Sequence, residues 1–154
     1  MARRRAADPA AEVDLQERMI ALIRAFGLHQ PDKTPCGRPV SVAEAHALME
    51  LSRGESGSPM VQKELASRLR LEKSTVSRLV GMLEDRRWVE RSRSLQDGRA
   101  MELRLTEAGR RAAEDIAEAR RAKFARVLEA IPEGERESVL EAMRVLEEAM
   151  RESE

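Results

Sequence analysis

Apolar residues near both ends of the chain recur at intervals of four, three and four residues. The first set comprises Leu15, Met19, Leu22 and Phe26, and the second comprises Val139, Met143, Leu146 and Met150. These intervals place the side chains of each set along one face of an α-helix. We therefore predict terminal helices over about residues 12–28 and 133–152, each with a coiled-coil-like seam that packs within the chain or against a partner.

Loop and cap signals place two further helices. Three prolines and a glycine make residues 29–39, HQPDKTPCGRP, a loop. The segment SVAE fits a capping box, in which Ser41 accepts a backbone hydrogen bond and Glu44 returns one. Thr106 fits the N-cap of a long helix, and Pro132 suits the first turn of the last one. The helices predicted from these signals cover about residues 41–53 and 106–130.

One segment follows the alternation of a strand rather than the spacing of a helix. WVERSRS at residues 88–94 and AMELRLT at residues 100–106 alternate apolar and polar residues around a turn that contains Asp97-Gly98, which predicts a β-hairpin. The predicted order of elements is then four helices, a hairpin and two long helices. This order corresponds to a mainly α fold in which the hairpin is the one β element.

Two short helices are predicted before the hairpin, over about residues 61–69 and 73–87, with the three residues RLE between them. That arrangement is typical of a helix-turn-helix. On a helical wheel, the second helix turns its apolar side chains to one side. Its opposite side and flanks carry Ser74, Thr75, Ser77, Arg78, Gly81 and Asp85. Hydroxyls and an arginine at the start of a helix suit phosphates and base edges, although a plain solvated face would look the same for this helix alone.

A hairpin that directly follows a helix-turn-helix forms a wing. Arg99 lies at its turn and can extend into a narrow minor groove, where the negative potential is enhanced. We expect the Asp97 carboxylate to hold the Arg99 guanidinium in position by a charge-assisted hydrogen bond. The alternative is an ordinary Asp-Gly hairpin turn, which would need no arginine at this place.

The distribution of charge agrees with a nucleic-acid partner. The net charge is zero, but residues 61–106 carry 11 basic and 7 acidic residues, whereas residues 107–154 carry 9 basic and 13 acidic ones. A basic excess over the helix pair and the hairpin can mark a face that binds an acid. The basic start, MARRRAADPA, is expected to be disordered and to add no more than a salt-dependent attraction to phosphate.

Other features of the sequence exclude several classes of protein. The single cysteine, Cys36, cannot form an internal disulfide. No apolar run reaches the ~18 residues of a membrane span, and the start lacks the apolar core of a signal peptide, so we expect a cytoplasmic protein with no membrane partner. GESGS does not fit the G-x-S-x-G nucleophile pattern, and no glycine-rich phosphate loop is present, so we do not expect an enzyme.

The segment ELASRLRLEKSTVSRLVGMLEDRRWVERSRSLQDGRAMELRLTEAG resembles the core of MarR-type transcriptional regulators. KSTVSRLV, DGR and LRLTEAG carry the resemblance, which extends in weaker form over the whole chain. It implies an obligate homodimer joined by its terminal helices, a pseudo-palindromic operator of double-stranded DNA, and repression relieved by a ligand. The DNA-binding positions that it implies are Ser74, Thr75, Ser77 and Arg78 in a recognition helix over residues 73–86, and Asp97 and Arg99 in the wing.

Arg87 departs from the pattern of that family. The family often has a glycine after the recognition helix, because glycine adopts the left-handed conformation with little strain. Here either Arg87 accepts a strain of roughly 1 kcal/mol, or the helix ends in another way.

The patterns and the resemblance together predict a winged helix-turn-helix domain with long N- and C-terminal dimerisation helices. The expected divisions are a disordered basic tail (1–11), N-terminal helices for dimerisation and ligand binding (12–54), the DNA-binding lobe (55–106) and C-terminal dimerisation helices (107–154).

The signal that such a regulator senses remains open among three hypotheses, and the first is a metal. His29, Cys36 and His46 lie within 18 residues and are the only histidines and cysteine in the chain. Cysteine and histidine suit zinc, which is therefore a candidate cofactor. EAHALMEL also resembles the second helix of zinc-responsive members of the family, in which a histidine at the place of His46 binds metal. Those members use further histidines on the fifth helix, where this chain has carboxylates such as Glu114 and Glu118.

The second hypothesis is a thiol-redox sensor built on Cys36, with Lys33 and Arg38 near it in the sequence. The third is a small organic ligand in an apolar pocket between the helices, or no ligand at all, with the histidines in structural roles. A protein of another class also fits the pattern: a helical partner-binding dimer whose wing has no DNA function.

Overall fold

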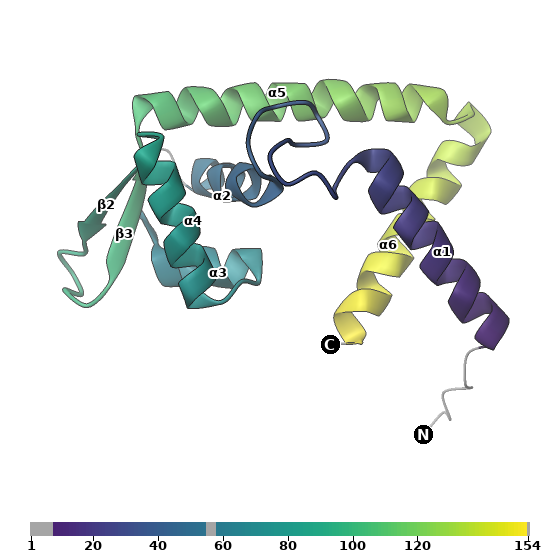
Figure 1. Cartoon of the computed structure of the whole chain (residues 1–154), viewed down its shortest axis with the longest axis horizontal. Coiled ribbons are helices and arrows are strands. Elements are labelled where there is room, and N and C mark those ends of the chain that lie inside the picture. Colours follow the sequence, from purple (N-terminus) through teal and green to yellow (C-terminus); the bar gives the residue numbers. More distant parts are fainter. Residues whose placement is uncertain (1–7, 55–57, 154) are drawn as a thin grey trace.

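The computed structural model describes residues 8–54 and 58–153, and it is mainly helical with a small antiparallel sheet (Figure 1). The elements in chain order are α1 (Pro9–Phe26), α2 (Val42–Arg53), β1 (Met60–Val61), α3 (Gln62–Leu69), α4 (Lys73–Asp85), β2 (Val89–Arg93), β3 (Met101–Leu105), α5 (Glu107–Ala130), a short 3-10 turn (Glu133–Glu135) and α6 (Arg136–Glu152). A lobe of α2, α3, α4 and the strands lies at one end of α5, and α1 and α6 lie toward the other. The predicted fold class, mainly α with a small β wing, is confirmed.

Local hydrogen bonds fix where two of the helices begin. The Ser41 hydroxyl accepts the N–H of Glu44 at 3.1 Å, and a Glu44 carboxylate oxygen accepts the N–H of Ser41 at 2.9 Å. The predicted capping box of α2 is therefore confirmed. Thr106 caps α5 as predicted, because its hydroxyl accepts the N–H of Gly109 at 2.9 Å.

The first helix begins earlier than its apolar stripe predicts. The Asp8 carboxylate accepts the N–H of Ala10 at 3.1 Å, and Pro9 occupies the first helical position, which proline favours. Residues 9–11 are therefore helical, and the prediction that they belong to a disordered tail is wrong. The rest of the predicted tail, residues 1–7, lies outside the described residues.

The sheet contains a strand that the sequence pattern does not reveal. β1 pairs antiparallel with β3, in the register Met60 with Leu103 and Val61 with Glu102, and the strand order is β1-β3-β2. Because Val61 belongs to this strand, the following helix starts at Gln62, one residue later than predicted. Two residues are too few to show the alternation by which a strand is predicted.

The core of the lobe is formed by apolar side chains from α2, α3, α4 and the strands. Its largest fully buried apolar members are Leu48, Leu65, Val76, Val80, Leu83 and Leu103. Ala113 and Ile116 attach the first half of α5 to this core. The side of α4 that packs inward is the apolar side that the helical wheel predicts, so its polar side remains exposed.

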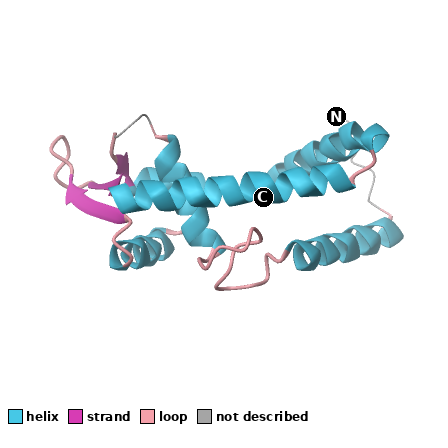
Figure 2. Cartoon of the chain, turned by 90° about the horizontal axis from the view of Figure 1, so that it is seen from above, coloured by secondary structure: helices cyan, strands magenta, loops and turns pink. Residues whose placement is uncertain are grey.

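The apolar stripes of the terminal helices stay exposed or half-buried in the single chain. No residue of α1 or α6, both of which the structure describes in full, is buried. The side chains of Leu22, Met143 and Met150 are 48%, 52% and 49% exposed. The two helices cross in Figure 1 but lie on opposite sides of α5 in Figure 2, so they do not cover each other. Among the described residues, no helix has the length and the apolar character to cross a membrane.

One junction joins α4, the sheet and α5. Arg87 adopts the left-handed conformation (φ 59°), and the N–H of Trp88 donates to the carbonyl of Leu83 at 2.9 Å, which ends α4 at Asp85 rather than near residue 87. The carbonyls of Arg87 and Trp88 accept the hydroxyl and the N–H of Thr106 at 2.7 and 3.0 Å. A Cβ on the buried Gly109 would lie 1.9 Å from the Trp88 carbonyl oxygen, so glycine alone fits there.

We predict that Gly109→Ala lowers the free energy of unfolding by about 3 kcal/mol, because the Trp88 backbone or α5 must move to admit the methyl group. Urea unfolding followed by circular dichroism measures the change. Gly81→Ala is the matched control, since nothing lies within 4 Å of a Cβ at that position and alanine favours a helix by about 1 kcal/mol over glycine. Equal stabilities for the two variants would contradict the prediction.

Candidate nucleic-acid interface

α3 and α4 form the helix pair that the sequence predicts, and a tight turn joins them. α3 ends with Arg70 in the left-handed conformation (φ 52°), and the N–H of Leu71 donates to the carbonyl of Ala66 at 3.1 Å. Ala66 itself is 7% exposed. Its small side chain allows α3 to pack closely against its neighbours at this end of the helix.

The exposed side of α4 carries the predicted polar residues. The side chains that it turns to solvent include those of Ser74, Thr75, Ser77 and Arg78. Lys73 begins the helix, and Glu72 at the N-cap forms no side-chain hydrogen bond with the first turn. Uncapped backbone N–H groups at the start of a helix, with a lysine beside them, suit phosphate oxygens.

Two side chains organise the wing by hydrogen bonds to its backbone. The Ser94 hydroxyl accepts the N–H groups of Gln96 and Asp97 at 3.2 and 3.3 Å. An Asp97 carboxylate oxygen accepts the N–H of Arg99 at 3.0 Å. The prediction that Asp97 holds the Arg99 guanidinium is wrong, because an aspartate side chain readily bonds to the backbone two residues on. The Arg99 side chain is exposed and forms no ion pair among the described residues.

An ion pair braces the wing against α4. Arg91 on β2 donates from Nη2 to Oε2 of Glu84, near the end of α4, at 2.8 Å. The Arg91 and Glu84 side chains are only 22% and 36% exposed, so solvent and salt screen this pair less than a fully exposed one. The pair holds the angle between α4 and the hairpin.

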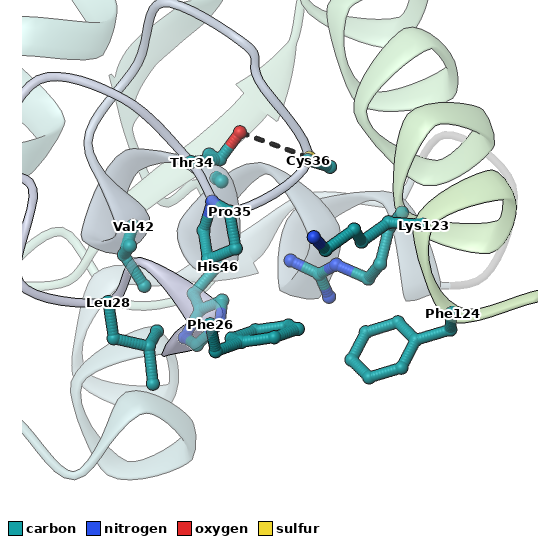
Figure 3. A pocket seen from close by; sticks show the side chains of 11 residues that line it. Phe26, Leu28, Thr34, Pro35, Cys36, Val42, His46, Lys123 and Phe124 are labelled. Carbon is teal, nitrogen blue, oxygen red and sulfur yellow. Dashed lines mark hydrogen bonds between the residues drawn. The ribbon is translucent and has the colours of Figure 1, made fainter. Parts of the chain in front are cut away.

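A second candidate site is a pocket of about 150 Å³ between the end of α1, the loop before α2 and the middle of α5 (Figure 3). Its apolar wall includes Phe26, Leu28, Val42 and Phe124. Arg120 and Lys123 of α5 add positive charge to the lining. Neither cation forms an ion pair within the described part of the chain, although the Lys123 ammonium lies 6.0 Å from the centroid of the Phe26 ring.

The structure brings together two of the three residues predicted to sense an effector. Cys36 and His46 line this pocket, whereas His29 does not. The Cys36 Sγ lies 3.0 Å from the Thr34 hydroxyl (Figure 3). The pKa of His46 is lowered, first because the protein partly shields it from solvent and then because Arg120 repels its charged form. Across residues 8–54 and 58–153, no three His, Cys, Asp or Glu side chains are grouped so that they could hold a metal ion, so the predicted trio forms no metal site.

A buried carboxylate connects the start of α2 to the end of α4. Glu44 is 1% exposed, and its Oε1 accepts the Arg86 Nε at 2.8 Å. The Arg86 guanidinium lies 4.9 Å from the centroid of the Trp88 ring, within reach of a cation–π interaction. Burial by itself would raise the pKa of Glu44, but the hydrogen bonds with Ser41 and the charge of Arg86 together lower it. Because Val42 and Ala45 of the same helix turn line the pocket, the ion pair joins the pocket wall to α4.

Four further candidate residues escape the sequence analysis. Arg120 and Lys123 lie on a helix in which charged residues recur, so nothing in the sequence marks them as pocket residues. Lys63 and Lys73 lie at the starts of α3 and α4 and line a groove beside the wing. The basic excess of residues 61–106 is the one signal that could have indicated this second pair.

Known proteins resemble this chain in sequence and in fold. A family model described as the MarR family matches residues 39–100. The PcaV transcriptional regulator from Streptomyces coelicolor, solved in complex with its natural ligand, has a TM-score of 0.68 and 23% identity, over 97% of this chain and 99% of that chain. FabT from Streptococcus pneumoniae, solved in complex with DNA, has a TM-score of 0.67 and 18% identity, over 94% and 96% of the two chains. A MarR family protein from Bacillus stearothermophilus has a TM-score of 0.70 and 22% identity, over 95% and 99%. No curated protein matches the sequence significantly.

Glu44→Gln is expected to lower the free energy of unfolding by about 2 kcal/mol at neutral pH. The N–H groups of Ser41 and Arg86 donate to different oxygens of the carboxylate, and in glutamine one of these oxygens is replaced by an NH₂ group that cannot accept. The folded-state pKa of Glu44 lies below its ordinary value. The stabilisation is therefore present at neutral pH and is lost as the pH falls through that folded-state pKa. Urea unfolding of both proteins at neutral and acid pH should show a difference that narrows in acid.

The matched control for this prediction is Glu141→Gln, which removes an exposed carboxylate paired with Arg144 and should change stability little. A difference between wild type and Glu44→Gln that stays constant with pH would contradict the assigned role of the carboxylate.

Proposed function

We propose that this chain, of which residues 39–100 match a model of the MarR family, is a homodimeric, sequence-specific DNA-binding transcriptional regulator. In this proposal the protein represses its own or a neighbouring operon until a small ligand binds to it and releases it from the DNA. The observation that carries the proposal is the exposure, on one lobe, of both the polar side of α4 and Arg99 of the wing. A winged helix-turn-helix reads DNA with these two parts.

The two parts are assigned to two grooves of the duplex. The recognition helix, residues 73–86, enters the major groove, where hydroxyls and an arginine can contact base edges and phosphates. The residues assigned to this contact are Ser74, Thr75, Ser77 and Arg78. Arg99 enters the adjacent minor groove, and Asp97 shapes the turn that presents it. FabT, which has the same fold and was solved in complex with DNA, supports DNA binding by a protein of this fold.

The exposed stripes of α1 and α6 support the homodimer. Side chains such as Leu22 and Met143 are about half exposed in the single chain, and a second copy would bury them. A two-fold axis through these helices would set the two recognition helices against successive major grooves, ~34–36 Å apart, on a pseudo-palindromic operator.

The pocket beside α5 supports release by a small ligand. A volume of about 150 Å³ admits one small organic molecule, and Arg120 and Lys123 favour one that carries a negative charge. A ligand there would press on α2, and the Glu44–Arg86 ion pair would transmit the displacement to α4. PcaV, which was solved with its natural ligand, supports ligand binding by a protein of this fold.

A metal or thiol-redox response is the second candidate, because Cys36 and His46 line the same pocket. Within one copy of the chain, the described residues offer no third ligand beside Cys36 and His46, so zinc would need a further ligand, for example from a second copy. A redox response would need only the Cys36 thiol, which already contacts the Thr34 hydroxyl.

Arg78→Ala and Arg99→Ala should each weaken binding to a labelled fragment of the protein's own upstream region by about tenfold or more, since each removes one groove contact. Fluorescence anisotropy at fixed salt measures the affinity, and sedimentation shows whether the dimer persists. Arg121→Ala, an exposed arginine of α5, is the control that should bind as wild type does. Undiminished affinity in the double variant would favour the helical partner-binding dimer instead.

The same binding assay tests which class of effector the protein responds to. It is repeated with zinc, a chelator, peroxide or a panel of small organic acids added. We expect an organic acid to release the fragment and the other additives to leave binding unchanged. Arg120→Met should weaken the response to the acid, because the side chain keeps much of its bulk but loses its charge, whereas Lys33→Met should not. A zinc or peroxide response that Cys36→Ser abolishes would favour the second candidate.

A further inference from the structure

A pocket of about 230 Å³ lies between α2, α3 and α5, and the proposed function makes no use of it. This α3 pocket shares His46 and Arg120 with the pocket of Figure 3, here named the α1 pocket. The two pockets differ in character, because the α1 pocket has an apolar wall. Among the described residues, Met49 and Leu69 are the only apolar side chains that line the α3 pocket. The α3 pocket therefore offers little surface to the body of an organic molecule.

Three guanidinium groups line the α3 pocket, one from each of its helices: Arg53 of α2, Arg68 of α3 and Arg120 of α5. A carboxylate oxygen of Glu50 lies 2.6 Å from a nitrogen of Arg53, and the other lies 3.6 Å from a nitrogen of Arg68. Glu64 also binds Arg68, at 2.6 Å. Arg120 is partly buried and has no carboxylate partner within residues 8–54 and 58–153. Three guanidinium groups thus share two carboxylates, and positive charge is left over in the pocket.

We propose that the α3 pocket binds a tetrahedral oxyanion: a phosphate ion or the phosphate group of a small ester. A guanidinium carries five N–H donors in a planar fork that matches the oxygens of a phosphate group. Here these forks come from three different helices. A tetrahedral anion has oxygens on all sides to meet them, whereas the oxygens of a carboxylate lie in one plane. The bound anion would pair Arg120 and join α5 to α3.

His46 would report the charge of the bound anion. The pKa of His46 is lowered, first by burial and then by the charge of Arg120, with a smaller contribution from Arg53 that Glu50 opposes. The charged and titratable groups that line the two pockets with His46 are Cys36, Glu50, Arg53, Arg68, Arg120 and Lys123. A dianion among them would favour the imidazolium form and raise the pKa of His46. Since binding then takes up a proton, the affinity for the anion rises as the pH falls through the raised pKa.

The test follows the imidazole resonances of the full-length protein by NMR during titration with sodium sulfate at constant ionic strength. Sulfate is the first probe because it stays a dianion at neutral and mildly acid pH, whereas phosphate takes up a proton there. We expect a saturable shift of the His46 resonance, a higher pKa of His46 with sulfate bound, and little shift of the His29 resonance, because His29 lines neither pocket. Inorganic phosphate and glycerol 3-phosphate should produce the same shift, and the one that binds more tightly indicates whether the preferred anion is free or esterified.

Variants that belong to one pocket only locate the anion. Arg68→Met should weaken sulfate binding by about tenfold or more, because hydrogen bonds to a charged group are lost. Arg53→Met provides a second variant of the α3 pocket if Arg68→Met fails to fold, as judged by circular dichroism. Lys123→Met is the matched control, since Lys123 lines the α1 pocket alone, and it should bind sulfate as wild type does.

Two results would overturn the inference. One is a His46 resonance that does not shift, or that drifts without saturation, as sulfate is added. The other is a loss of affinity in Lys123→Met that equals or exceeds the loss in the α3-pocket variants, which would place the anion in the α1 pocket. The assay contains no DNA, so neither result bears on the proposed DNA binding.

Discussion

The packing of Gly109 against the carbonyl of Trp88 is the contact on which the rest of the arrangement depends. It brings the first turn of α5 against the turn that ends α4, where the Arg87 carbonyl accepts the Thr106 hydroxyl at 2.7 Å. α5 is continuous for 24 residues, so its position at this contact also decides where Arg120 meets α2. One backbone contact therefore sets the relative positions of α4, the wing and the pocket beside α5. The strain of a left-handed Arg87 is the conformational cost of making this contact.

Among the residues that the structure describes, ion pairs hold α4 only near its C-terminal end. Near its C-terminus, Glu84 binds Arg91 of the wing strand, and Arg86, just beyond the helix, binds the buried Glu44 of α2. Its N-terminal turn has no side-chain cap and carries exposed polar residues. The C-terminal end of α4 is thus held by ion pairs to the wing and to α2. The N-terminal end, which these pairs do not hold, carries the side chains proposed to contact DNA. A displacement of α2 would reach α4 and the wing through these two pairs.

Much of the fold can be predicted from the sequence because helices, caps and turns depend on neighbours a few residues away. The apolar side of α4 and the Ser41–Glu44 capping box follow from spacing alone. The hydrogen-bond partner of Asp97 is mispredicted. Arg99 offers two donors, its guanidinium and its backbone N–H, and the carboxylate accepts the backbone N–H. β1 is missed because its two residues form a strand only by pairing with β3.

The sequence by itself determined the helix order, the exposed polar side of α4 and the wing, since each depends on local periodicity and turn chemistry. Tertiary structure alone decided which distant residues share a site. Glu44 and Arg86 are 42 positions apart, and the pocket joins Phe26 and Cys36 to Arg120. Contacts of this kind depend on the angles at which helices cross, and those angles are set by packing at points such as Gly109 that no local pattern encodes.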